Sequence, residues 1–119
     1  MMEKWMLFPY VFVGGGLGAS LRWLLSITFH SSGLPLWWAT LIVNILGTFI
    51  YFLSVKMMGN DIIWSQSFLR FGILGSLTTF STFSYEVAYS VKSGQPLQAL
   101  AIFGLNILAG VLIAIGMLR

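Results

Sequence analysis

The chain has 119 residues, of which 58% are hydrophobic and 8% are charged, and its formal net charge is +3. This length allows one domain, and so low a charged fraction, against about 25% in soluble globular proteins, excludes a water-soluble fold. The six basic residues are scattered, which excludes a nucleic-acid-binding patch, and the lack of cysteine excludes disulfides and thiolate chemistry. We therefore expect a small all-α membrane protein.

Four apolar segments follow one another along the chain, each with the roughly 20 residues that a helix needs to cross the hydrocarbon core. The first covers residues 5–29, too long for the apolar stretch of about 7–15 residues in a cleaved signal peptide. The others cover residues 36–58, 66–91 and 97–118, with short turns between them. We predict one transmembrane domain over residues 1–119, whose function lies within the membrane.

The first span carries an arginine, Arg22, one turn after the glycine-rich run Gly14-Gly-Gly-Leu-Gly18. Small residues at this spacing permit close packing between helices. An arginine at this depth is either a fixed charge that attracts an anion or a structural residue that snorkels toward the headgroups. The sequence leaves both readings open.

The second and fourth spans each contain one amide side chain near the middle, Asn44 and Asn106. A buried amide either joins two helices through hydrogen bonds or donates a hydrogen bond to a passing ion. Two midspan asparagines in so short a chain give the pore reading about the same weight as the packing reading.

The third span has the composition least suited to a lipid-facing helix. Glycines at positions 72 and 75 are followed by five hydroxyl residues within positions 78–84. Glycine lowers helix stability, and Ser and Thr compete for backbone hydrogen bonds. We predict that this helix is broken near its middle, at about residues 75–78. Broken helices are tolerated at this depth where they line a cavity or coordinate an ion.

Beyond the predicted break, Phe80 and Phe83 share a helix face, beside a stripe formed by Thr79, Thr82 and Glu86. An aromatic ring has a negative face and a positive edge. Two ring edges next to hydroxyl and amide donors can therefore hold a small, strongly hydrated anion. The alternative is that the two rings form an ordinary packing pair.

These segments closely resemble the signature of the Fluc (CrcB) family of fluoride channels. The resemblance rests mainly on Gly75-Ser-Leu-Thr-Thr-Phe-Ser-Thr-Phe83, which is quite specific. It extends to the segment that ends at Arg22, to Val43-Asn-Ile-Leu-Gly-Thr-Phe49 and to Asn106, and so covers all four spans in order.

The resemblance implies a passive channel that exports fluoride from the cytoplasm across the cell (inner) membrane. It implies an antiparallel, dual-topology dimer of four-helix subunits, either a homodimer or a paired heterodimer. It also implies a structural sodium ion at the dimer interface, held by the backbone carbonyls of Gly75 and Thr78. The residues it assigns to the fluoride pore are Asn44, Phe80, Phe83, Thr79, Thr82, Ser81, Asn106 and Arg22, with Glu86 at the pore mouth.

The chain departs from the family pattern at two positions. Ser76 stands where many relatives have glycine, which alters the predicted break slightly, and Gly110 stands where some relatives offer a serine donor. The basic residues give only a mild orientation bias, since both sides of the membrane carry some. The predicted N-terminal side has Lys4, Lys56, Arg70 and Arg119, and the other has Lys92 with Arg22 nearby.

A small proton-coupled multidrug exporter is the alternative function, because such proteins also have four spans and this size. They depend on a carboxylate in the first span, where this chain has Arg22 and no acid. An enzyme is not expected, because the sequence has no carboxylate pair, histidine cluster or Ser/His arrangement.

Overall fold

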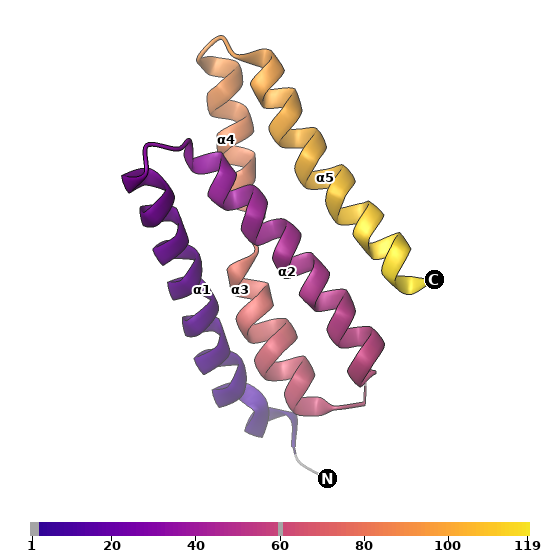
Figure 1. Cartoon of the computed structure of the whole chain (residues 1–119). Helices are drawn as coiled ribbons and strands as arrows, with labels where there is room; N and C mark the ends of the chain where they lie inside the picture. The colour runs from indigo at the N-terminus through magenta and orange to yellow at the C-terminus, as the bar shows by residue number, and fades with distance from the viewer. Residues whose placement is uncertain (1–2, 60) are drawn as a thin grey trace.

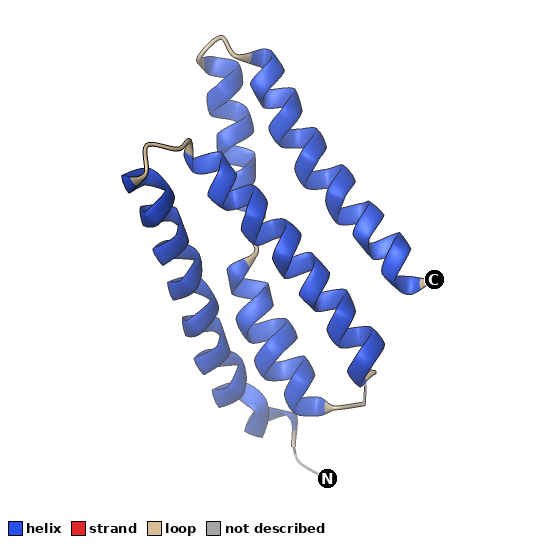
Figure 2. Ribbon diagram, in the orientation of Figure 1, coloured by secondary structure: helices blue, strands red, loops and turns tan. Residues whose placement is uncertain are grey.

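The computed structural model describes residues 3–59 and 61–119, and this part of the chain consists of helices and turns with no strand (Figure 2). A 3₁₀ turn, η1 (Lys4–Leu7), leads into α1 (Phe8–Ser31), followed by α2 (Leu36–Met58) and, last, α5 (Pro96–Leu118). These three helices are long and apolar enough to cross a membrane. The prediction of an all-α membrane protein is confirmed.

The third predicted span, residues 66–91, is made of separate helical pieces, so the predicted break is present. A π-helical segment, η2 (Ser65–Leu74), continues into the short α3 (Gly75–Leu77), and α4 (Phe80–Lys92) completes the crossing. The chain is extended between them, with ψ of 150° at Thr78 and φ, ψ of −146°, 123° at Thr79. The break therefore begins at the C-terminal end of the predicted interval, residues 75–78, because β-branched threonines favour extended backbone.

Glycines with positive φ end the helices on the side opposite the N-terminus. Gly33 has φ of 73°, and after it Leu34 N donates to Phe29 O at 3.2 Å. Gly94 has the same φ, and after it Gln95 N donates to Ser90 O at 2.8 Å. This six-to-one hydrogen bond around a left-handed residue closes α1 and α4 and turns the chain back into the membrane.

The helices form two packed groups that share α2 (Figure 1). The helix α1 lies along η2 and α3, whereas α5 lies against α2 and α4. The buried cluster of Val43, Leu74 and Leu77 joins α2 to the first half of the broken helix. The break consequently lies where the two groups meet, beside the middle of α2.

Backbone contact between α1 and η2 depends on glycine. A Cβ added to Gly14 would lie 3.0 Å from the Gly72 Cα, and one added to Gly72 would lie 2.9 Å from the Gly14 Cα. A Cβ on Gly18 would strike the carbonyl oxygen of Ile73. The glycine-rich run thus packs the first helix directly on the backbone of the third.

Gly14→Ala is expected to destabilise the protein by about 1–3 kcal/mol, since the added methyl meets backbone atoms that cannot rotate away. Gly16→Ala is the matched control, because nothing lies within 4 Å of a Cβ there. That control should be neutral or more stable by up to about 1 kcal/mol, from better helix propensity. Denaturant unfolding in detergent micelles checks both, and equal stabilities would contradict the packing described.

A buried arginine, Arg70, fastens η2 to the end of α2. Its Nε donates to Ser54 Oγ at 2.9 Å, and Nη2 donates to the carbonyls of Ser54, at 3.0 Å, and Gly59. Cations are favoured at helix C-termini, where carbonyls lack intrahelical partners. The sequence suggested Arg70 only as an interfacial charge, and the structure gives it this second, internal role.

Candidate functional site

The break in the third crossing is held by the side chain of Asn44 on α2. Its Oδ1 accepts a hydrogen bond from Thr79 N at 2.8 Å, and its Nδ2 donates to Thr79 O at 3.2 Å. The same Nδ2 donates to Asn106 Oδ1 at 2.8 Å, and Asn106 Nδ2 donates to Ile102 O at 2.9 Å. An amide pair from α2 and α5 thus replaces the helical hydrogen bonds that the extended residue has lost.

The carbonyls that lose their usual helical donors at the break include those of Gly75 and Thr78. The amide that would donate to Gly75 O belongs to Thr79 and is bonded to Asn44. The amide that would donate to Thr78 O belongs to Thr82, and it donates to Thr79 Oγ1 at 3.2 Å. Gly75 is exposed on the surface of the single chain. These are the two carbonyls that the resemblance assigns to sodium, and carbonyl oxygens suit a hard cation.

Five of the residues assigned to the pore meet at one surface hollow of about 240 Å³ beside the break. They are Asn44, Thr79, Phe80, Phe83 and Asn106. The ring centroids of Phe80 and Phe83 are 5.7 Å apart, with 54° between the ring planes. Phe83 is 4% exposed, whereas Phe80 is 76% exposed. The Phe83 ring is therefore buried among the helices, and the Phe80 ring lies on the surface of the single chain.

Hydroxyl groups continue from this hollow along the start of α4. Thr79 is the N-cap of α4, and its Oγ1 also donates to Thr82 Oγ1 at 3.1 Å. Ser81 is exposed, with its Oγ 3.3 Å from Thr79 Oγ1. The hydroxyl groups of Thr79, Ser81 and Thr82 form what we call the hydroxyl row. This row lies at the N-terminal, positive end of the α4 helix dipole, where negative charge is favoured.

Glu86 lies one turn beyond Thr82, in a second cavity of about 480 Å³ that Thr82 also lines. Thr40 Oγ1, on α2, donates to Glu86 Oε1 at 2.6 Å. The acid is therefore joined to the second helix, and it lies away from the hollow that holds the two phenylalanines.

Arg22 lies apart from both cavities, on the α1 side of the broken helix. Its Nε donates to Ser76 O at 3.1 Å. The carbonyl of Ser76 is in the last turn of α3, where the break leaves carbonyls without helical donors. In this structure Arg22 caps that half-helix, which agrees with the structural reading of this residue.

Arg22→Leu is expected to lower the free energy of unfolding by about 1–3 kcal/mol, because the Ser76 carbonyl loses its donor. Arg22→Lys keeps the charge but loses the guanidinium geometry, and should recover only part of that stability. Denaturant unfolding measured alongside anion efflux separates the two readings. Full stability with reduced efflux in Arg22→Leu would instead favour the fixed-charge reading.

Two contacts at the site were not expected from the sequence. Thr40 bonds Glu86, and the Phe103 ring lies 6.1 Å from the Phe83 ring, with 32° between their planes. A signal for both was present, because Thr40 precedes Asn44 by four residues and Phe103 precedes Asn106 by three. These spacings place each pair on one helix face.

Comparison with known proteins gives one family and many relatives. The family model described as CrcB-like protein, Camphor Resistance (CrcB), matches residues 9–117. The chain is 40% identical to Fluoride-specific ion channel FluC 1 of Yersinia pseudotuberculosis, over 82% of this chain and 79% of that protein. It is 41% identical to FluC of Serratia proteamaculans, over 87% of this chain and 83% of that protein. FluC 2 of Staphylococcus haemolyticus is 39% identical, over 85% and 84%.

Proposed function

This chain belongs to the CrcB-like protein family, and from that premise we propose that it is a fluoride-specific ion channel. It is a multi-pass membrane protein and not an enzyme. The channel conducts passively and exports fluoride from the cytoplasm across the inner cell membrane. This lowers the fluoride that enters the cell as the neutral acid and ionises there.

The observation that carries the proposal is the hollow where Phe80, Phe83 and the two asparagines meet beside the break. Fluoride is small and strongly hydrated, so a pore must replace its water with donors and positive ring edges. Ring edges, the hydroxyl row and the positive end of α4 supply such partners together. Larger halides need more room than a narrow path of this kind offers.

The working channel is an antiparallel dimer, most simply a homodimer. Support comes from Phe80, which is 76% exposed on the single chain, so that its hollow is open on one side. A second copy laid against this face would close the hollow into a path. The scattered basic residues, which give only a mild orientation bias, also support insertion in both orientations.

A structural sodium ion at the dimer interface completes the proposal. Its ligands are the carbonyls of Gly75 and Thr78 from each subunit, and the loss of their helical donors supports this assignment. Sodium would supply fixed positive charge and hold the two breaks together.

Replacing sodium by a large organic cation should lower the unfolding temperature of the dimer and reduce fluoride efflux, since a ligand of the folded state stabilises it. Unchanged stability would contradict a sodium site.

The function is tested by efflux from liposomes that contain the purified protein alone. A fluoride electrode and a chloride electrode follow the two anions in parallel. We expect rapid fluoride release with negligible chloride release. Equal release of both anions would contradict fluoride specificity, and no release from a well-folded dimer would contradict a self-sufficient channel.

The orientation is tested with one added cysteine, which is selective because the chain has none of its own. Arg119→Cys carries the label at the C-terminus. In a dual-topology dimer, a membrane-impermeant thiol reagent outside sealed vesicles should label about half of the chains. Labelling of nearly all or nearly none would contradict the antiparallel arrangement.

A further inference from the structure

The two asparagines beside the break differ in how many of their N–H groups are already bonded. Asn44 Nδ2 donates to Thr79 O at 3.2 Å and to Asn106 Oδ1 at 2.8 Å. An amide nitrogen carries two N–H groups, so both donors of Asn44 are in use. In the part of the chain that the structure describes, Asn106 Nδ2 has one acceptor, Ile102 O at 2.9 Å. One N–H of Asn106 is therefore left for a further acceptor.

The orientation of both amides is fixed by their partners. The backbone N–H of Thr79 can only donate, so the Asn44 atom that faces it at 2.8 Å is the oxygen. The Asn44 nitrogen then faces Asn106, and the Asn106 atom that accepts from it must also be an oxygen. This places the Asn106 nitrogen toward Ile102 O. Exchanging oxygen and nitrogen in either side chain would set two donors or two acceptors against each other.

The free N–H belongs to a residue of the hollow that holds the aromatic pair. Both asparagines line that hollow together with Phe80 and Phe83. On α5, Asn106 follows Phe103 by three residues, and the Phe103 ring lies 6.1 Å from the Phe83 ring. One face of α5 therefore presents both a ring and the amide to the aromatic pair.

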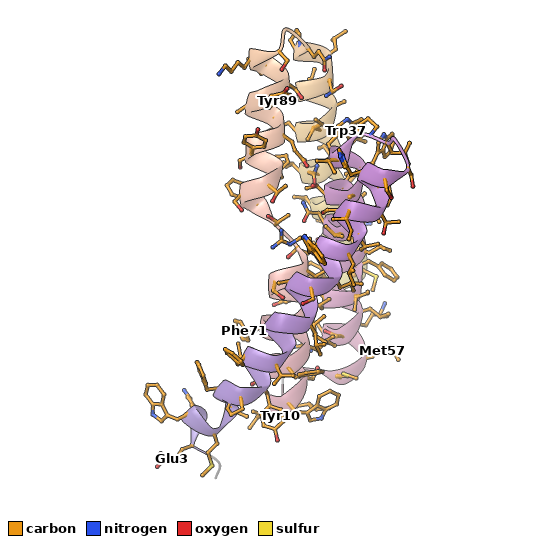
Figure 3. All side chains as sticks on the ribbon, turned by 90° about the vertical axis from the view of Figure 1, so that its left-hand side faces the viewer. Glu3, Tyr10, Trp37, Met57, Phe71 and Tyr89 are labelled. Carbon is orange, nitrogen blue, oxygen red and sulfur yellow. The ribbon has the colours of Figure 1, made fainter. Side chains whose placement is uncertain are left out.

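Releasing an N–H of Asn44 to an anion would break one of its two existing bonds. Figure 3 shows Trp37 and Met57 toward opposite ends of α2, and Asn44 lies between them along this helix. At this depth water does not readily replace a lost partner. Loss of Thr79 O would leave a carbonyl of the break without its donor, and loss of Asn106 Oδ1 would separate the amide pair. Asn106 can bind an anion without either loss.

We infer that Asn106 supplies the amide donor to the permeating anion, and that Asn44 is a positioning residue that does not contact it. The inference rests on the proposed fluoride channel and departs from the resemblance, which assigns both asparagines to the pore alike. Asn44 holds the break through Thr79 and fixes the Asn106 amide through its Oδ1. This donation also polarises the Asn106 amide, because hydrogen bonds in a chain strengthen one another at low dielectric.

The contact is tested by solid-state NMR of the protein labelled with ¹⁵N-asparagine, in lipid bilayers that contain fluoride. The chain has three asparagines. Asn60→Gln and Asn106→Ala each identify one side-chain signal by its disappearance, and the third signal belongs to Asn44. The dipolar coupling between ¹⁹F and ¹⁵N falls steeply with distance, so it reports which amide contacts the anion. We expect fluoride to dephase the Asn106 signal strongly and the Asn44 signal weakly.

The contribution to permeation is tested by fluoride efflux from liposomes that contain Asn106→Ala. We expect efflux to fall at least about tenfold, as when one hydrogen bond to a charged group is lost. Slow hydrogen exchange at the Thr79 amide should persist, since both bonds between Asn44 and Thr79 remain. Gln98→Ala is the matched control. It also removes an α5 amide that bonds another helix, through Ser90 Oγ at 3.1 Å, but Gln98 does not line the hollow.

The outcomes separate this inference from the proposed function. Fluoride release by the wild type, with the Asn44 signal dephased as strongly as that of Asn106 or with neither signal dephased, would overturn the inference and leave the channel standing. Wild-type efflux from Asn106→Ala, or an equal loss of efflux in Gln98→Ala, would overturn the donor role. A wild type that releases no fluoride would overturn the proposed channel, and this inference with it.

Discussion

Phe80→Ile is expected to reduce fluoride efflux at least about tenfold while the protein keeps its stability. Isoleucine has no positive ring edge, so a partner of the anion is lost. A tenfold loss of rate corresponds to only about 1.4 kcal/mol at the barrier. The ring is 76% exposed, so little packing is lost. Efflux from liposomes, with denaturant unfolding in parallel, measures both effects.

Phe83→Ile should also reduce fluoride efflux at least about tenfold, but this result can be interpreted only with a parallel measurement of stability. Phe83 is 4% exposed and packs against Phe103, so its replacement also disturbs the bundle. Phe12→Ile serves as a matched control for both, because Phe12 is an exposed aromatic on α1 that lines none of the cavities described. Normal fluoride efflux in both Phe80→Ile and Phe83→Ile would refute the aromatic-pore assignment.

Asn44→Ala is expected to destabilise the fold strongly as well as stop conduction. The substitution leaves the N–H and C=O of Thr79 without their partners, at about 1–3 kcal/mol for each group. Within a membrane no water replaces them cheaply. We expect faster hydrogen exchange at the backbone amides of residues 79–81, together with a lower free energy of unfolding in detergent.

Two related substitutions divide the roles of this amide. Asn44→Asp can still accept a hydrogen bond from Thr79 N but cannot donate one to Thr79 O. We therefore expect it to lower the free energy of unfolding by less than Asn44→Ala does. Asn106→Ala removes the bond between the two side chains and the bond of Asn106 to Ile102 O, but it leaves both bonds between Asn44 and Thr79, so it should lower the stability least. A double-mutant cycle gives the coupling between the asparagines. Wild-type stability in Asn44→Ala would show that the break does not depend on this amide.

The sequence was sufficient for the fold class and for the existence of the break. The apolar segments, each long enough to cross a membrane, indicate the fold class. The many glycine and hydroxyl residues in the third span indicate the break. The predicted interval for the break, residues 75–78, includes the extended Thr78. Within that interval Gly75 stays helical, and the extended backbone continues into Thr79. What fixes the break is the pairing of Thr79 with Asn44, 35 residues away, which local propensity cannot contain.

The hydrogen-bond partners of other site residues could not be predicted, because they depend on how each helix is oriented about its axis relative to its neighbours. The sequence alone left Arg22 between two roles, and its bond to Ser76 became visible only with the packing of α1. The partner of Glu86 required the orientation of α2. The π-helical geometry of η2 has no clear sequence signal, since such segments are rare. The residues of the third-span motif, by contrast, were identified from the sequence because they are consecutive.

The bond between Arg22 and Ser76 also has a consequence for biosynthesis. The two residues are 54 positions apart, so at about 5–20 residues per second the ribosome adds Ser76 about 3–11 s after Arg22. During that interval the first helix enters the bilayer with a guanidinium whose carbonyl partner does not yet exist. Its long side chain must reach the headgroups until the third crossing arrives. The nascent first helix is therefore held shallow by its own arginine, and it takes its final depth only after most of the chain has been translated.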